Sequence, residues 1–413
     1  MSLFMNRFLS IVLALLMMLA FGFIGMACDK PVQSLDVQDQ VTRQERLHQK
    51  LGDQVGQVYD IFAPGPLIAE LVAVNPERSP ERTVDAVVER ITTLRKEKKL
   101  PLASSQRPGG ARTAHELARI LLTPSEALET DLPTTDLELV VLAVSVLKVH
   151  GIRSHAAIIS KSTRTTQLEH VVLAVELDSN STPKMFELTD AQTDLSSDFK
   201  TLSDIQVIGL YHARFAGLLF LLNKTPEAIS NLEVAMALAS DLATPYYVRA
   251  LMNEHKENMQ EQVLEDLQRV TQQKDAPDIW AWMGRTLRKL KRYDEARAML
   301  VRVPSDSSSY QIAQFELARL SCEEDNADGF FRLISFVRSL DASFWEAHRD
   351  AALVGMINGR TSVVEKAIQA GLRVAPSLEV WNLLIKAKDL EPEQWPEPLK
   401  IRLSMLGACA RPL

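Results

Sequence analysis

The sequence is poor in cysteine, and it has no motif that would hold a metal or a nucleotide. Its 413 residues include three cysteines, Cys28, Cys322 and Cys409, whose spacing fits no metal site. His115-Glu116 lacks the second histidine of a zinc-protease motif, and no glycine-rich phosphate loop is present. We therefore expect neither metal nor cofactor. In an oxidising compartment Cys322 and Cys409 could pair as a disulfide, but two free buried thiols are the simpler expectation.

Positive charge and aromatic residues are also scarce. The formal net charge is −7, and aromatic residues make up 6% of the chain. This composition argues against nucleic-acid binding and against general binding to anionic membrane surfaces. Hydrophobic residues make up 46%, which is enough for two or three domains with real cores. Plentiful Leu, Ala, Val and Glu favour a largely helical protein.

The amino terminus carries a long uncharged hydrophobic run. After one basic residue, Arg7, residues 8–27 hold no charge, and Cys28 follows at once. This order is typical of an export signal, although a run of this length could also remain in the bilayer as a helix. Ala27-Cys28 resembles the lipobox of bacterial lipoproteins, in which a small residue precedes the cysteine that receives the lipid. Gly25 stands where that pattern usually has a leucine.

Three forms of export are therefore open: a lipoprotein anchored through Cys28, an uncleaved anchor helix, and an ordinary secreted protein. The resemblance to lipoproteins implies a place in the bacterial cell envelope, with the body of the protein in the periplasm. Residues 29–40 are short and polar, which indicates a tether. Residues 41–100 follow with amphipathic helical patterns, one of which begins at the start signal Ser79-Pro80-Glu81.

A helix and three strands are predicted between residues 113 and 205. Thr135-Asp-Leu-Glu138 forms a capping box that opens a helix over 136–150, and Gly151 closes that helix. Three apolar segments rich in β-branched residues, each bounded by polar turns, are then expected to be strands. They span 154–160, 170–177 and 184–190. The pattern predicts a helix packed on a small antiparallel sheet.

From residue 209 onward the strand signals stop and a repeat begins. Counted in steps of 34 from Gly209, the eighth position of each unit is small and the fourth is bulky. The eighth positions are Ala216, Ala250, Gly284, Ala318 and Ala352, and the fourth positions are His212, Tyr246, Trp280, Gln314 and His348. A small residue is needed where two helices of one hairpin approach closely, and a large residue fills the gap beside it. This period and pattern are the tetratricopeptide signature.

The repeats match this signature to different degrees. The third matches best, with Trp280, Gly284 and Tyr293 at consensus positions. The second and fourth are degenerate, because Gln262 and Phe330 occupy their inner small position. We predict five repeats over 209–378 and a closing cap after them.

Residues 130–195 resemble the transglutaminase-like branch of the papain fold. That family has a cysteine at a helix start, then Gly-Ile and a strand, a histidine that opens a second strand, and an aspartate that ends a third. This chain has Gly151-Ile152 after the helix, His170 at the start of the second strand and Asp190 at the end of the third. Counted back from the glycine, the cysteine position falls at 134–136, where this chain has Thr-Thr-Asp.

The resemblance implies a site that has lost its nucleophile. In the family a helix amino terminus and an imidazolium stabilise a thiolate; His170 would be that histidine, and Asp190 would fix its tautomer. Thr134 or Thr135 cannot be ionised in this way and would need full general-base help. One interpretation is a vestigial site, with Thr135 at the nucleophile position and His170 as a structural histidine. The alternative is a hydrolase or acyltransferase that uses Thr134 or Thr135 with His170 and Asp190.

A basic run lies in the third repeat, at Arg285, Arg288, Lys289, Lys291 and Arg292. Such runs are usually solvated helix faces. The alternative is a docking patch for an acidic partner, made by Arg285, Arg288, Lys289 and Arg292.

Together these features predict a non-catalytic, membrane-tethered envelope protein that acts as a protein-binding adaptor or assembly factor through its solenoid. The expected fold is an α+β module, a helix on a small antiparallel sheet, followed by an all-α solenoid. The predicted divisions are a signal or anchor (1–28), a tether (29–40), a helical region (41–112), a transglutaminase-like module (113–205), five repeats (209–378) and a C-terminal cap (379–413).

Overall fold

The fold is taken from a computed structural model of the chain. The residues that it describes are 43, 45–51, 61–62, 79–97, 136–159, 169–178, 182–189, 195, 198–273, 275–374 and 377–410. The predicted export signal, lipidation site and tether lie outside these residues. Among the helices within them, none is long and apolar enough to cross a membrane.

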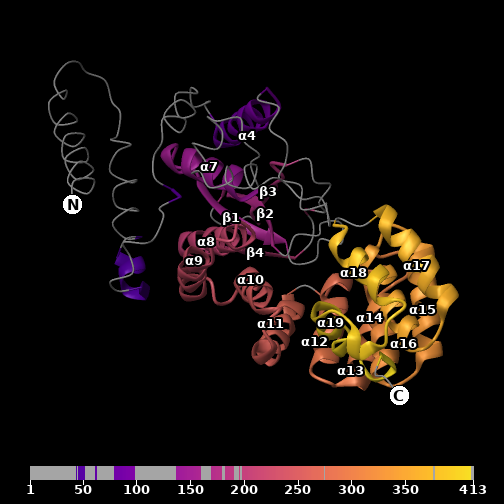
Figure 1. Ribbon diagram of the computed structural model, residues 1–413. Helices are drawn as coiled ribbons and strands as arrows, with labels where there is room; N and C mark the ends of the chain where they lie inside the picture. The colour runs from indigo at the N-terminus through magenta and orange to yellow at the C-terminus, as the bar shows by residue number, and fades with distance from the viewer. Residues whose placement is uncertain are drawn as a thin grey trace, which may run out of the picture. The chain divides into compact units, whose positions relative to one another are not determined.

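Two helices that the sequence predicts precede the sheet (Figure 1). Helix α4 (Pro80–Glu97) begins at the expected signal, where the Ser79 hydroxyl accepts a hydrogen bond from the Arg82 amide at 3.3 Å. Helix α7 (Asp136–Val149) is buried over most of its length, as expected for a core helix. It ends at Gly151, which has a φ of +71°. The Ile152 amide donates to the Leu147 carbonyl at 3.0 Å, which confirms the predicted glycine-closed end.

A four-stranded antiparallel sheet packs against α7. Its strands are β1 (Arg153–Ile159), β2 (His170–Glu176), β3 (Lys184–Phe186) and β4 (Phe199–Thr201), in the order β3-β2-β1-β4. The three predicted strands are confirmed, but β3 stops at Phe186, four residues before the predicted end. Strand β4 was not predicted, because three residues are too few to show a period.

Both faces of the two central strands are buried. Ala156, Ile158, Val171, Leu173 and Val175 belong to the same apolar cluster as α7. Ala157, Ile159, Val172 and Ala174 form a second cluster on the opposite face. Because both faces are buried along most of their length, these strands have continuous apolar runs rather than alternating ones.

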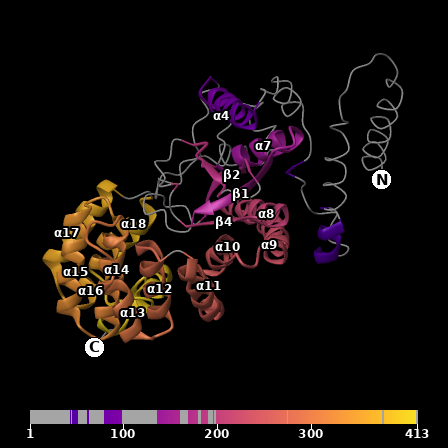
Figure 2. The same cartoon turned by 180° about the vertical axis from the view of Figure 1, so that it is seen from behind.

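Five helical hairpins follow the sheet, and each pairs a first helix with a second one. They are α8 (Asp204–Leu221) with α9 (Thr225–Leu238), α10 (Ala243–Asn253) with α11 (Gln260–Gln273), α12 (Pro277–Lys289) with α13 (Tyr293–Val301), α14 (Tyr310–Glu323) with α15 (Ala327–Leu340), and α16 (Trp345–Ile357) with α17 (Thr361–Val374). Helix α8 also lies beside β1 (Figures 1 and 2). The part of the chain that the structure describes is therefore mostly helical, with tetratricopeptide-like hairpins and a small sheet.

The turns inside the hairpins repeat with the predicted period. Lys291, Asp325 and Gly359 follow one another at intervals of 34 residues, and each has a φ near +60°. Asn223, two intervals before Lys291, has the same conformation. The second hairpin differs, because a short 3-10 helix (Glu257–Met259) replaces this turn. A left-handed residue after the first helix is thus a structural signature of four of the five hairpins.

The eighth positions confirm the predicted register. All five are buried. A Cβ built on Gly284 would lie 2.5 Å from the Cγ of Leu300 on α13, so only glycine fits where α12 and α13 meet. Trp280, by contrast, is not the fully buried filler that the repeat pattern predicts. It is half-buried, with the guanidinium of Arg302 3.9 Å from its ring.

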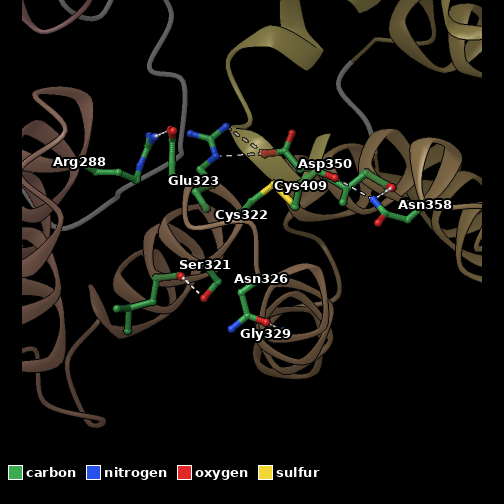
Figure 3. Close-up of a disulfide and its surroundings, with 12 residues drawn as sticks. Arg288, Ser321, Cys322, Glu323, Asn326, Gly329, Asp350, Asn358 and Cys409 are labelled. Atoms are coloured by element: carbon green, nitrogen blue, oxygen red, sulfur yellow. Dashed lines mark hydrogen bonds and ion pairs between the residues drawn. A yellow bond between two sulfur atoms is a disulfide. The ribbon is translucent and has the colours of Figure 1, made fainter. Parts of the chain in front are cut away.

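The chain continues after α17 through α18 (Glu379–Ala387), the 3-10 helix η3 (Pro392–Gln394), α19 (Glu397–Ser404) and the 3-10 helix η4 (Ala408–Ala410). Cys322 at the end of α14 and Cys409 in η4 form a disulfide with an S–S distance of 2.00 Å (Figure 3). The expectation of two free thiols was therefore wrong. The sequence could not show this pairing, because it depends on the final segment returning to α14.

Candidate functional site

The candidate site is built on the first residue of α7. The Asp136 carboxylate is 1% exposed and accepts several hydrogen bonds. Its Oδ1 accepts from the Leu137 amide at 2.9 Å and from the Arg214 guanidinium at 2.6 Å. Its Oδ2 accepts from the Val171 amide at 2.7 Å and lies 3.2 Å from Nδ1 of His170. Burial alone would raise the pKa of Asp136, but Arg214 and His170 hold it well below its usual range.

His170 lies between two carboxylates. Its Nε2 is 2.5 Å from Oε2 of Glu187, a residue that directly follows β3. The other oxygen of Glu187 accepts from the amide and the hydroxyl of Thr189, at 2.9 and 2.6 Å. Burial lowers the pKa of His170, but the hydrogen bonds and charges of Asp136 and Glu187 outweigh it and raise the pKa to about 9. At neutral pH the ring is an imidazolium that donates from both nitrogens.

The site is tied to the first two hairpins. Arg214 on α8 contacts Asp136 through one amino group and donates through the other to the Glu169 carbonyl at 2.8 Å. The Glu169 side chain, 2% exposed, accepts from the Ala243 amide at 2.5 Å and from the amide and hydroxyl of Thr244, at the start of α10. A carboxylate at a helix amino terminus is favourable, because it satisfies free amides and faces the positive end of the dipole. Burial nevertheless raises the pKa of Glu169.

The sequence located part of this arrangement. His170 opens β2, as predicted, and lies beside the start of α7. Thr134, Thr135 and Asp190 lie outside the described residues, so their roles stay predictions. Asp136, the last residue of the window in which the family has its cysteine, contacts the imidazole.

Glu187 was missed. The sequence extends the third strand to residue 190, whereas β3 ends at Phe186. Glu187 is therefore the first residue after the strand, and its side chain reaches His170. A carboxylate near the end of that strand was the available signal, and the resemblance to the family placed that carboxylate at Asp190.

The arrangement stabilises a protonated His170 ring and does not favour nucleophilic chemistry. A general base must offer an unprotonated nitrogen to the group that it activates. Each ring nitrogen of His170 faces a carboxylate, so the protonated form is the stabilised one. Asp136 is buried and paired with Arg214, so its oxygens are not presented to a substrate. Among the residues that the structure describes, no group of histidine, cysteine, aspartate and glutamate side chains fits a metal ion.

The second candidate site, the basic run of α12, is largely neutralised within the chain. Arg285 pairs with Glu254 at 2.8 Å and with Glu316 at 2.9 Å. Arg288 is 6% exposed and pairs with Glu316 and Glu323, both at 3.0 Å. The prediction of a solvated face was therefore wrong for Arg288.

The other two residues of the predicted docking patch, Lys289 and Arg292, lie nearer the surface. Lys289 is exposed and donates to the Glu254 carbonyl at 2.7 Å, and burial of its amino group lowers its pKa. Arg292 pairs with Glu295 at 2.6 Å on the surface. Of the four residues predicted to bind a partner, Lys289 and Arg292 lie at the surface, and their role in binding stays a prediction.

These ion pairs continue along the first helices of the hairpins, and we call them the first-helix ladder. From Glu316, the ladder passes on α14 to Arg319, which pairs with Asp350 of α16 at 3.0 Å. Asp350 is 0% exposed and also accepts from Arg349 at 2.9 Å. The ladder thus links the end of α10, α12, α14 and α16 through ion pairs.

Comparison with known proteins finds a likeness to a solved tetratricopeptide protein. No model of a known protein family matches the chain, and no curated protein matches it. Among solved structures, YrrB, described as a TPR protein with an unusual peptide-binding site, matches over 44% of this chain and 92% of its own. The sequence identity is 19% and the TM-score is 0.33. At this level the match is no more than a partial likeness between helical repeats.

Proposed function

We propose that the protein is a non-catalytic adaptor or assembly factor that binds another protein through its solenoid. The observation that carries the proposal is the position of His170 between Asp136 and Glu187, with Arg214 behind Asp136. A histidine held as an imidazolium donates two hydrogen bonds and stabilises its surroundings, but it cannot act as a base. The transglutaminase-like module is, in this proposal, a scaffold whose former reaction centre has become a structural ion cluster.

The solenoid supplies the binding surface. Stacked helical hairpins form extended surfaces that are suited to protein partners. The α+β module closes the amino-terminal end of the stack, since Arg214 and Glu169 bind it to α8 and α10. End caps are required in repeat proteins because the terminal unit would otherwise expose its apolar face. The cluster therefore supports the adaptor role by holding this cap in place.

An exported location is part of the proposal. The run at 8–27 followed by Cys28 is the sequence basis for it. The disulfide between Cys322 and Cys409 supports it, because such bonds persist in oxidising compartments and are rare in the cytosol. We propose that the protein is anchored to a membrane through lipidated Cys28 or an amino-terminal helix, with the body in the periplasm.

Two experiments test the proposal. The full-length protein is crosslinked in cells and extracted in detergent, and its partners are identified. A Lys289→Glu variant tests an exposed residue of the basic run. A defined partner retained by His170→Gln supports a non-catalytic adaptor.

In parallel, wild type and His170→Gln are assayed for amidase, protease and acyl-transfer activity. An activity present in wild type and lost in the variant, with unchanged folding, would establish instead the hydrolase or acyltransferase that uses Thr134 or Thr135.

A further inference from the structure

The last part of the chain runs back along the repeats instead of extending them. Helix α18 packs on α16 and α17, after which α19 packs on α16 and η4 packs on both α14 and α16. We call residues 391–410 the strap. The strap therefore covers the first helices of the fourth and fifth hairpins, which are the helices that carry the end of the ladder.

The inner side of the strap is apolar. Trp395, Leu399, Leu403 and Leu406 are at most 7% exposed and belong to the same apolar cluster as the helices beneath them. Ile401 and Met405 face outward and are 50% and 53% exposed. The strap thus resembles an apolar segment bound to a surface, with a clear inner and outer side.

The ion pair between the strap and the helix beneath it is weak. Nη2 of Arg402 lies 3.4 Å from Oδ1 of Asp350, which already pairs with Arg319 and Arg349. The Nε atom of Arg402 is buried and has no hydrogen-bond partner among the described residues. Burial and the charges of the two neighbouring guanidinium groups lower the pKa of Arg402 to about 10. Arg402 can leave this place without depriving Asp350 of its partners.

A covalent bond secures the end of the strap. Cys409 is joined to Cys322, and its carbonyl accepts a hydrogen bond from the Asn358 side chain at 2.8 Å (Figure 3). Gly407, with a φ of +106°, lies so close to α14 that an added Cβ would be 2.7 Å from Cα of Glu323. Cys322 is 0% exposed, so the closed strap shields its sulfur. The disulfide therefore holds a segment whose own ionic contact is poor.

On the basis of the proposed partner-binding role, we propose that the strap is a segment that closes over a binding surface and that the Cys322–Cys409 disulfide holds it closed. With the disulfide formed, it occupies the α14 and α16 surface and leaves α10 and α12 for the partner. With both thiols free, the strap opens and exposes that surface to a helical segment of the partner. That segment resembles the strap, because it carries two leucines at the spacing of Leu399 and Leu403.

The lock forms by thiol–disulfide exchange with a disulfide-donor protein. The S–S bond of the donor breaks, the Cys322–Cys409 bond forms, and the two electrons and two protons of the cysteine thiols pass to the donor as a dithiol.

Hydrogen exchange on the full chain tests the closure. In oxidised wild type, the amides of α19 are expected to be protected like those of α16. In Cys409→Ser they are expected to exchange at least ~10-fold faster, while α14 and α16 keep their protection. Unchanged protection of α19, or a joint loss of protection over α14, α16 and α19, would overturn the proposal and leave a purely structural staple.

Matched variants sharpen this test through the accessibility of the Cys322 thiol. In the Cys409→Ser background, maleimide labelling of Cys322 is followed by peptide mapping. Leu403→Lys on the inner side is expected to raise the labelling rate at least ~10-fold, whereas Ile401→Lys on the outer side is expected to leave it unchanged. Equal effects of the two variants would contradict a strap that opens from its inner side.

A synthetic fluorescent peptide of residues 391–408 tests the exposed surface. It is expected to bind Cys409→Ser and not oxidised wild type, and absence of binding to both would overturn the docking surface. These outcomes are independent of the proposed function. If the strap opens but no partner is found, the adaptor function is refuted and the opening of the strap stands. If the strap never opens, the proposed opening is refuted and the adaptor function stands.

Discussion

The α+β module and the solenoid hold their charged groups in different ways. In the module, Asp136 of α7, His170 of β2 and Glu187, which follows β3, meet at one point, where Arg214 of α8 joins them. In the solenoid, ion pairs recur from one first helix to the next along the ladder. The module therefore depends on a few contacts that nothing else replaces, whereas the solenoid distributes its stability over similar units. Substitutions in the two regions should therefore have effects of different size.

The largest effect is expected for Arg214→Leu. This change leaves the buried Asp136 carboxylate without its guanidinium, and breaking a buried pair in this way costs roughly 3–5 kcal/mol. Urea denaturation measures the change in the free energy of unfolding. Arg153→Leu is the control, since its pair with Glu176 is 3.7 Å long and largely exposed, and it should cost less than about 1 kcal/mol. Equal losses of unfolding free energy in the two variants would contradict the difference expected between a buried ion cluster and a surface ion pair.

The second effect is the pH dependence of the cluster. The pKa of His170 is raised from 6.5 to about 9, so the native state binds the proton more tightly than the unfolded chain does. Its contribution to stability is complete below pH 6.5 and is lost as the pH rises to about 9, by at most about 1.4 kcal/mol per pH unit. The stability difference between wild type and His170→Gln should therefore shrink between pH 6.5 and 9. A difference that grows over this range would contradict the assignment.

In the solenoid, Gly284→Leu should have an intermediate effect. Any side chain at this position meets Leu300 of the partner helix, and overpacking of this kind costs about 1–3 kcal/mol. Thermal unfolding measures the loss. Lys289→Ala, at an exposed position of the same helix, is the control and should change stability by no more than about 0.5 kcal/mol. A melting temperature that Gly284→Leu leaves unchanged would count against the register.

The smallest effect is expected at the repeated turns. Lys291 adopts a left-handed conformation that costs a side-chain-bearing residue about 1–2 kcal/mol, part of which the added freedom of glycine cancels in the unfolded chain. Lys291→Gly should thus gain roughly 0.5 kcal/mol. Gly359→Ala, at the equivalent turn of the last hairpin, should lose a similar amount or more. Changes of the same sign in both variants would show that the turns are not equivalent.

The same contrast explains what the sequence could predict. The solenoid was readable because its small eighth positions and bulky fourth positions recur every 34 residues, so one strong repeat and four weaker ones reinforce one another. The central helix and three strands were readable from local patterns. Glu187, Arg214 and Glu169 were not, because each acts through a partner far along the chain. The Cys322–Cys409 bond escaped prediction for the same reason.

The central claim is that His170 is a structural imidazolium and not a catalytic base. NMR titration of the full chain, with His170 assigned by comparison with His170→Gln, measures this most directly. The account predicts that both ring nitrogens stay protonated through pH 7.5 and that the ring titrates near pH 9. A neutral His170 ring at pH 7.5, with a pKa at or below 6.5, would contradict the account and restore a basic nitrogen to the site.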